Sequence, residues 1–277
     1  MPVTPLQPLL SGALRTGAAA VVALSLGGCL ARGTPETTGS LQRTDAPVSE
    51  ASLRQSSEAL GQKFEANPAD ADTAIAYAGT LRRLGQHAQA VAVLQQATIR
   101  NPRALPVLAA YGKALAEAGR FREAQEVLAK AHLPERPDWR ILSVQGTVAD
   151  QLGDFQGAQR YYEAALRIVP GEPTVLSNQG LSYALAKRLP EGEVIMRQAA
   201  LHQRADGRVR QNLALVLGLQ GKFAEAESVL KQDMQPQEAA QTLASIKRMM
   251  AQPNSWKALR QQAEAKPSEA RKPGQNG

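Results

Sequence analysis

The chain has 277 residues, of which 43% are hydrophobic and only 4% are aromatic, and Cys29 is its single cysteine. Because one thiol cannot form an intrachain disulfide, the composition excludes a disulfide-stabilised scaffold. The formal net charge is +7, but the basic residues are mixed with acidic ones and form no arginine stripe interleaved with aromatic residues, so nucleic-acid binding is not predicted.

The first thirty residues have the pattern of a targeting signal. Arg15 precedes an apolar run that ends at Leu26, and Gly27, Gly28 and Cys29 follow. This run is too short for a transmembrane helix, which needs about 20 apolar residues, and it is typical of a secretory signal peptide. An ordinary signal peptide with an incidental cysteine and a buried amphipathic segment are the alternatives.

The ending Leu26-Gly27-Gly28-Cys29 resembles the bacterial lipobox. That resemblance implies cleavage before Cys29 and acylation of its sulfur and of the new amine, so residues 1–28 are expected to be a lipoprotein signal peptide. Several acyl chains together anchor a protein durably to a membrane. The residue after the cysteine is Leu30 and not aspartate, which by the same resemblance implies the periplasmic face of the bacterial outer membrane.

Residues 29–48 are rich in Gly, Thr, Pro, Ser and Gln, and this composition predicts a flexible tether. Helical periodicity begins near Ser49, with Leu53, Leu60 and Phe64 on one face. The helix is expected to end before Pro68, because proline cannot continue it.

A motif around a turn then returns five times with a spacing of 34 residues. Its central position holds a glycine, or a lysine in the fourth copy: Gly85, Gly119, Gly153, Lys187 and Gly221. Small residues recur seven positions before this turn, at Ala78, Gly112, Gly146, Gly180 and Ala214, and five positions after it, at Ala90, Ala124, Ala158, Gly192 and Ala226. Large apolar residues follow at Leu94, Leu128, Tyr162, Met196 and Leu230.

This period and these positions resemble the tetratricopeptide repeat. The resemblance implies an all-α solenoid, a right-handed superhelix of antiparallel helix pairs with a concave face, because each hairpin hides its apolar stripe only by stacking on its neighbours. The expected solenoid covers residues 49–252, with units at about 71–104, 105–138, 139–172, 173–206 and 207–240 and with capping helices at both ends.

Three segments depart from the repeat pattern. Lys187 replaces the turn glycine, so the turn of unit four is expected to be the least regular. Arg210 and Asp233 stand in unit five where a large apolar residue and an alanine are expected, which predicts a more hydrated seam. Residues 237–250 predict an end-capping helix with Ala240, Leu243, Ile246, Met249 and Met250 on one side.

Residues 253–277 predict a short amphipathic helix and a disordered basic tail. Trp256, near Lys257 and Arg260, invites a membrane-surface or partner-docking role, and packing of the Trp against the terminal helix is the simpler alternative.

Motifs of catalysis and of cofactor binding are absent from the sequence. It has no nucleophile elbow, no phosphate-binding loop and no glycine-rich dinucleotide signature. The histidines, His87, His132 and His202, have no further ligands at metal-binding spacing. We therefore expect no enzyme, no cofactor and no metal site.

The repeat resemblance implies a partner-binding groove lined by the second, fifth, ninth and twelfth positions of each first helix. Carried over by register, these positions are Ile75, Arg82, Lys113, Arg140, Ser143, Thr147, Asp150, Ser177, Leu181, Arg208, Gln211 and Leu215. Arg82, Lys113 and Arg140 are candidates for holding acidic side chains or a C-terminal carboxylate. The simpler alternative is that they only keep the groove hydrated, and the Lys/Asn set of the carboxylate clamp is not reproduced.

Anchor, tether and repeats together resemble the lipoproteins of bacterial envelope machines, and the TadD family of the Tad (tight adherence, Flp pilus) assembly system in particular. The features are the Leu26–Cys29 ending, the segment Gly221-Lys222-Phe223-Ala224-Glu225-Ala226-Glu227, and the stretch from Gln237 to Trp256. The resemblance implies a non-enzymatic outer-membrane scaffold with protein partners, among them a secretin or a pilus assembly component, and membrane contact through the lipid anchor. The alternative is a repeat lipoprotein that binds cell-wall enzymes or outer-membrane protein precursors.

Overall fold

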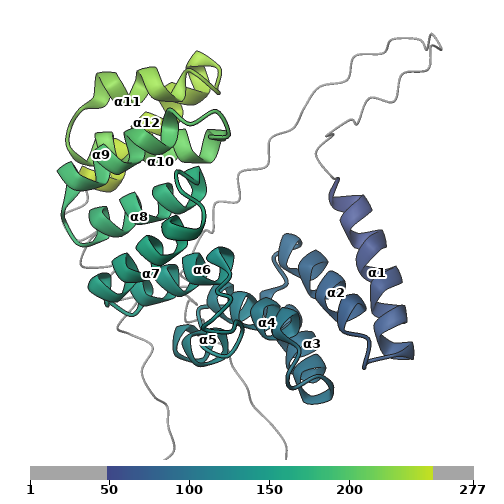
Figure 1. The fold of residues 1–277 in the computed structure, drawn as a ribbon. Coiled ribbons are helices and arrows are strands. Elements are labelled where there is room, and N and C mark those ends of the chain that lie inside the picture. Colours follow the sequence, from purple (N-terminus) through teal and green to yellow (C-terminus); the bar gives the residue numbers. More distant parts are fainter. Residues whose placement is uncertain (1–48, 252–277) are drawn as a thin grey trace, which may run out of the picture. The chain divides into compact units, whose positions relative to one another are not determined.

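A computed structural model describes residues 49–251 of the chain (Figure 1). This part contains twelve α-helices and no β-strand, and its one isolated β-bridge joins Leu133 and Arg136. The helices are α1 Glu50–Ala66, α2 Ala71–Arg83, α3 His87–Arg100, α4 Leu105–Glu117, α5 Phe121–Leu128, α6 Trp139–Gln151, α7 Phe155–Ile168, α8 Pro173–Leu185, α9 Leu189–Ala200, α10 Gly207–Leu219, α11 Phe223–Leu230 and α12 Pro236–Ala251. Among these helices, none combines the length and the apolar character needed to cross a membrane.

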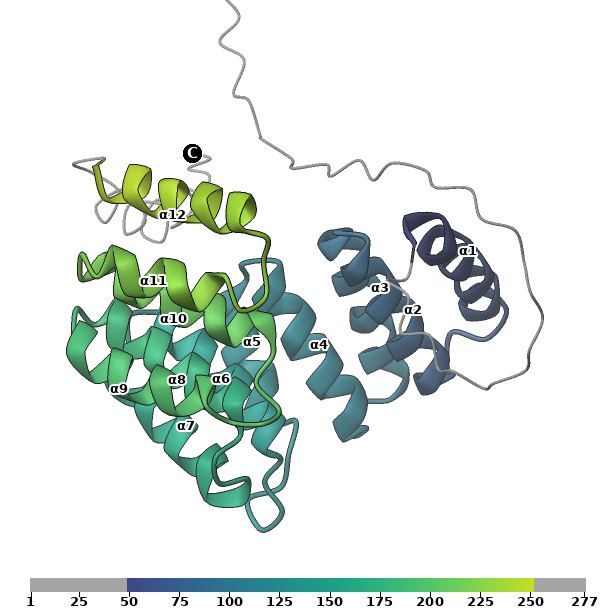
Figure 2. The same cartoon turned by 90° about the horizontal axis from the view of Figure 1, so that it is seen from above.

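The helices from α2 to α11 form five hairpins that stack in chain order. Within a hairpin the two helices pack against each other, and each second helix also packs against the first helix of the next hairpin. At the two ends, α1 packs on α2, and α12 packs on α10 and α11 (Figure 2). The fold class expected from the sequence, an all-α repeat solenoid, is confirmed.

Within a hairpin, a small residue of the first helix packs against a large side chain of the second helix. In unit three, a Cβ added to Gly146 of α6 would lie 2.6 Å from the Tyr162 ring of α7. Tyr162 is fully buried, together with Ala158 and Ala165 on its own helix. The recurring glycine and alanine positions therefore exist because the large side chain of the second helix needs that space.

The turns between paired helices share one backbone conformation. Gly85, Gly119, Gly153 and Gly221 have φ between 73° and 83°. Lys187 has φ of 63°, and the amide after it donates to the carbonyl five positions back at 2.8 Å, as the corresponding amide does at 2.9 Å in unit three. The expectation of an irregular turn in unit four was wrong, because the helix-terminating hydrogen bond holds Lys187 in the left-handed conformation that glycine adopts elsewhere.

The two ends of the array differ from its middle. Ser49 caps α1 by accepting the amide of Ser52, and Phe64, the one aromatic residue of that helix, is buried. At the other end, α12 buries Ala239, Leu243 and Ile246, whereas Ala240 is exposed. The face expected for this helix was therefore wrong at Ala240 and at Met250, which is 38% exposed, although Leu243 and Ile246 lie inward as expected.

The polar seam that the sequence predicts in unit five contains an ion pair between Arg210 and Asp233. Arg210 of α10 donates two hydrogen bonds of 2.5 Å to the two carboxylate oxygens of Asp233, and a third of 3.1 Å to the carbonyl of Ala205. In unit four the equivalent positions hold Leu176 and Ala199, which are buried in one apolar cluster. A charged pair has thus replaced an apolar contact at the same place in the repeat.

Candidate functional site

The first helices of the hairpins form one continuous row. Helix α2 packs on α4, α4 on α6, α6 on α8 and α8 on α10. Equivalent positions of successive first helices therefore lie side by side, and these are the positions from which the sequence predicts a partner-binding groove.

Polar side chains tie neighbouring first helices together at a sequence separation of 35. Arg82 of α2 makes two hydrogen bonds of 2.5 Å with Glu117 of α4. The amide of Asn178 donates to the Ser143 hydroxyl at 3.1 Å, and the amide of Asn212 donates to the Ser177 hydroxyl at 3.0 Å. These ties set the relative position of the helices that carry the candidate site.

Three predicted groove residues lie inside the packed structure. Ser143, Asp150 and Ser177 have exposed fractions of 6%, 8% and 3%. The two serines accept the asparagine amides described above, so their hydroxyls are engaged between helices. In this structure the two serines join neighbouring units. Their low exposure gives no support to the predicted contact with a partner.

Asp150 is the centre of a buried polar network. One carboxylate oxygen accepts from the Ser182 hydroxyl at 2.6 Å, and the other accepts from the Tyr162 hydroxyl at 2.9 Å. Thr147 lies 3.3 Å from the Tyr162 hydroxyl, and Gln159 donates to Ser182 at 2.9 Å. Burial raises the pKa of the Asp150 carboxyl to about 6, and the hydrogen bonds from Ser182 and Tyr162 only partly oppose this effect.

Arg82 is engaged by a carboxylate that the sequence analysis did not single out. Glu117 also lies 3.8 Å from His87, and burial works to raise the pKa of its carboxyl. The hydrogen bond and charge of Arg82 outweigh that effect, so the net pKa of Glu117 is lowered. The pairing depends on repeat geometry, because Arg82 and Glu117 are neighbours only once α2 and α4 are stacked.

Two exposed groove candidates line a hollow of about 170 Å³ between α4 and α6. Lys113 and Thr147, both ninth-position residues, lie on its wall. The rest of the lining is mainly apolar and consists of Ala116, Glu117, Phe121, Val144 and Val148. A hollow of this size is smaller than the sites of drug-sized ligands and suits one side chain of a bound peptide.

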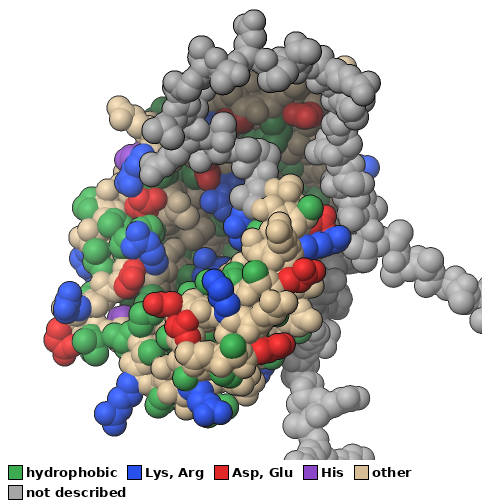
Figure 3. Space-filling view, turned by 90° about the vertical axis from the view of Figure 1, so that its right-hand side faces the viewer, with side chains coloured by type: hydrophobic (Ala, Val, Ile, Leu, Met, Phe, Trp, Pro, Cys, Tyr) green, Lys and Arg blue, Asp and Glu red, His purple; other side chains and the backbone are tan. Residues whose placement is uncertain are grey.

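Lys113 provides the charge at this hollow. Within residues 49–251 its ammonium has no ion pair and no side-chain hydrogen bond, whereas Arg82 is paired with Glu117. Burial lowers the pKa of Lys113, as does the nearby charge of Arg82, while Glu117 raises it and Arg208 of α10 lowers it further. Three cations, from units one, two and five, thus act on the same region. The space-filling view shows, on one face of the molecule, Lys and Arg side chains in a hollowed part of the surface (Figure 3).

The other candidates lie outside the hollow. Arg140 stacks on the Trp139 ring at 4.5 Å, and Arg208 lies 3.1 Å from Asp206 and is mostly exposed. Gln211 is exposed, while Ile75, Leu181 and Leu215 are half-buried. The structure therefore brings Lys113 and Thr147 together, and it distributes the remaining candidates along the row of first helices.

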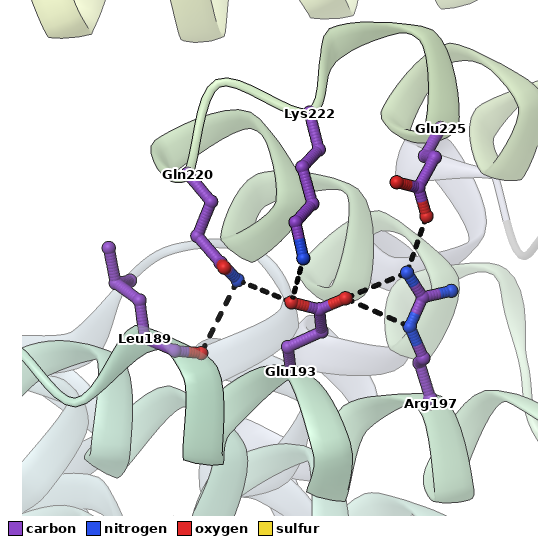
Figure 4. Close-up of polar contacts among 6 residues, drawn as sticks. All are labelled: Leu189, Glu193, Arg197, Gln220, Lys222 and Glu225. Atoms are coloured by element: carbon purple, nitrogen blue, oxygen red, sulfur yellow. Dashed lines mark hydrogen bonds and ion pairs between the residues drawn. The ribbon is translucent and has the colours of Figure 1, made fainter.

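A second charged cluster joins units four and five (Figure 4). Glu193 of α9 accepts from Arg197 at 2.7 and 3.0 Å, from Gln220 at 2.8 Å and from Lys222 at 2.6 Å. Arg197 also donates to Glu225 of α11 at 2.5 Å. Burial works to raise the pKa of Glu193, but the hydrogen bonds from Lys222, Arg197 and Gln220 lower it to about 2. The cluster connects two hairpins, and no signal in the sequence pattern distinguishes it from ordinary surface charges.

The histidines and carboxylates of the described part of the chain do not gather into a metal site. Residues 49–251 contain no group of three or more His, Cys, Asp or Glu side chains placed to hold a metal ion. His132 lies 3.3 Å from Gln145, and His202 accepts the amide of Arg204 at 3.1 Å. The predicted lipidation site Cys29 and the Trp256 segment lie outside the described residues.

Models of the tetratricopeptide repeat match three adjacent segments, residues 81–145, 144–208 and 207–232, which together make up more than half of the chain. The comparison with curated proteins gave no match.

Several solved structures share the fold. A tetratricopeptide repeat protein from Parabacteroides merdae has a TM-score of 0.57 at 16% identity, over 80% of this chain and 89% of its own. PilW, described as a widely conserved type IV pilus biogenesis factor, has a TM-score of 0.55 at 19% identity, over 66% of this chain and 86% of its own. PilF of Pseudomonas aeruginosa has a TM-score of 0.50 at 21% identity, over 76% of this chain and 90% of its own.

The repeat models, the five stacked hairpins and these structures agree on the fold, and the fold is one that typically mediates protein–protein interaction without catalysis. The chain belongs to the tetratricopeptide-repeat family and is an all-α repeat solenoid.

Proposed function

We propose that this protein is a non-enzymatic outer-membrane lipoprotein that acts as a protein-interaction scaffold in the assembly of a Tad/Flp-type pilus or of its secretin. The observation that carries the binding role is the hollow between α4 and α6, where the unpaired Lys113 stands beside an apolar wall. Such a site suits a peptide with an acidic side chain next to an apolar one.

The pilus role rests on the resemblance of the signal sequence, repeats and closing segment to the TadD family. PilW and PilF are pilus proteins of the same fold, but at 19% and 21% identity their likeness concerns the fold alone. The lipid anchor is inferred from the Leu26–Cys29 ending, and the periplasmic face of the outer membrane from Leu30, which stands where an aspartate would favour inner-membrane retention.

Gene deletion with complementation tests this function. Deletion is expected to remove surface pili and to reduce multimers of the secretin. A wild-type copy restores both, whereas a Lys113→Glu copy restores neither, because the charge that meets the acidic partner is reversed. Arg122→Glu, a charge reversal at an exposed position of α5, is the matched control and restores both.

Two outcomes would contradict the proposal. Unchanged pili and secretin multimers after deletion would remove the pilus role. Restoration by Lys113→Glu as complete as by wild type would remove the hollow from the mechanism. Capture of a peptidoglycan synthase or hydrolase from the envelope, without a secretin or pilus component, would favour the cell-wall alternative.

A further inference from the structure

The second helices end in a row of exposed aliphatic side chains. Ile99, Leu133, Ile168 and Leu201 are 73%, 49%, 41% and 86% exposed. Ile99, Leu133 and Leu201 are separated by multiples of the 34-residue repeat, and Ile168 lies one position from the missing member. Single exposed aliphatic residues are ordinary, but three of these four share one position in the 34-residue repeat and the fourth lies next to it.

The position in the repeat sets these residues apart from other exposed aliphatics. They account for four of the eight large hydrophobic residues that are exposed in the described part of the chain, and the most exposed of all, Leu201, is among them. Ile99 and Ile168 lie at the ends of α3 and α7, Leu201 directly follows α9, and Leu133 lies in the loop five residues after α5. Because equivalent positions of stacked units lie on one edge of a solenoid, they form a single row.

Unpaired arginines accompany the row. Arg100, Arg103, Arg136 and Arg167 lie within four residues of one of the aliphatic side chains and are exposed, and none of them forms an ion pair within residues 49–251. We call the four aliphatic residues and these four arginines the basic apolar edge.

Most of the acidic residues near this edge are engaged in hydrogen bonds or ion pairs. The loops that connect successive units contain six of them. Asp70, Asp138, Glu172 and Asp206 each accept a backbone amide at the start of the next helix, and Asp233 pairs with Arg210. Glu135 is the remaining one. Within residues 49–251, the four arginines of the edge thus have no carboxylate partner, whereas Glu172, Asp206 and Asp233 each pair with a different arginine.

We propose that the basic apolar edge lies on the surface of an anionic lipid membrane. Each arginine near such a surface contributes about 1 kcal/mol of attraction, and the aliphatic side chains enter the boundary between headgroups and acyl chains. A protein partner would need a contiguous complementary surface. A bilayer surface, in contrast, can receive separate aliphatic side chains that lie one repeat apart with charges between them.

The position of the predicted anchor agrees with this arrangement, and in this one respect the inference rests on the proposed function. Twenty residues from Cys29 to Val48 precede α1, and a chain of that length spans at most about 70 Å. An acylated Cys29 would thus keep the array within reach of the membrane, and the edge would determine which side of the array faces it.

Sedimentation with lipid vesicles tests the edge separately from the anchor. The processed chain, residues 29–277, carries Cys29→Ser and so has no acyl group. It is mixed with vesicles of phosphatidylglycerol and phosphatidylethanolamine, or with vesicles of phosphatidylcholine alone. We expect binding to the anionic vesicles and much weaker binding to the neutral ones.

Two double variants and two controls locate the binding. Arg100→Gln with Arg136→Gln should weaken binding by about tenfold or more, and Ile99→Asn with Leu201→Asn by a similar factor. The controls are Arg122→Gln with Arg160→Gln, which remove the same charge from other exposed positions of second helices, and Val194→Asn, which changes an aliphatic residue that is 67% exposed on α9. They should change the affinity by less than twofold.

The inference is overturned if the unacylated chain does not bind anionic vesicles, or if the controls weaken binding as much as the edge variants. It is also overturned if the edge variants convert a dimer into a monomer without lipid, since the edge would then be an interface between copies. None of these results depends on acylation of Cys29 or on pilus assembly, so failure here is distinguishable from failure of the proposed function.

Discussion

Lys187 is the one residue other than glycine with positive φ in the described part of the chain. A side chain in this conformation costs about 1 kcal/mol relative to glycine. Lys187→Gly is therefore expected to raise the free energy of unfolding by about that amount, measured by denaturant titration.

The turn of unit three supplies the opposite test. Gly153 has φ of 83° and open space around it, so only backbone strain opposes a side chain there. Gly153→Leu should lower the free energy of unfolding by about 1 kcal/mol. If Lys187→Gly also destabilises, or if Gly153→Leu melts like wild type, the turn conformation assigned to the repeat is incorrect.

Asp150 should make stability depend on pH in an unusual direction. Its folded pKa of about 6 lies above the ordinary value of 3.8 for an aspartate, so the folded chain binds the proton more tightly than the unfolded chain. This contribution to the free energy of unfolding should increase as the pH falls from about 7 to about 4, by up to roughly 3 kcal/mol. Comparing wild type with Asp150→Asn across this range isolates the effect, and parallel curves for the two would show that Asp150 does not titrate there.

At the scale of elements, the Glu193 cluster should respond to pH with the opposite sign. The folded pKa of Glu193, about 2, lies below the ordinary value of 4.5 for a glutamate. The stability that the carboxylate contributes is therefore present above about pH 4.5 and lost as the pH falls toward 2. Glu193→Gln should lower the free energy of unfolding at pH 7 by about 2 kcal/mol, and the difference from wild type should vanish under acid conditions. A difference that persists at low pH would mean that packing, and not charge, sets the cost.

The seam between α10 and the loop after α11 provides a second test at this scale. Arg210→Leu and Asp233→Ala should each destabilise by about 1–2 kcal/mol, because each leaves a partly buried charge without its partner. The double variant restores the residue types of unit four and should be at least as stable as wild type. An additive loss in the double-mutant cycle would show that the ion pair does not couple these elements.

Helices and their pairing could be predicted from the sequence because prolines, turn glycines and the 34-residue period mark the ends of each hairpin. The fate of individual groove residues could not. Ser143 and Asp150 occupy groove positions by register, yet they are buried by Asn178, Ser182 and Tyr162. Such contacts depend on how closely successive units stack, which the period alone does not specify.

The residues of the hollow that the sequence did not predict also depend on how successive units stack. Val144 and Val148 stand next to predicted positions, and they face the hollow because α4 and α6 leave a gap that their side chains line. Lys113 was predicted from register, but its lack of a partner follows from the pairing of Arg82 with Glu117. The candidate site is thus a product of stacking as much as of motif.

At the scale of the whole molecule, the chain is a stack of hairpins. Its first helices carry the proposed binding site, and the ends of its second helices carry the proposed basic apolar edge. Acylation at Cys29 is expected to fix the protein to the membrane. Metabolic labelling with a fatty acid should mark the wild type, and Cys29→Ser should lose the label and appear in the soluble periplasmic fraction. A labelled Cys29→Ser protein, or an unlabelled wild type, would rule out this anchor.

The central claim is that the hollow at Lys113 receives a protein partner. A photo-crosslinking amino acid placed at Thr147, on the wall of the same hollow and with Lys113 left in place, tests it most directly in the living cell, with the same residue at Val194 of α9 as the control. We predict a discrete crosslinked protein from position 147 and none from position 194. Equal adducts from both positions, or an adduct from position 194 alone, would contradict the claim.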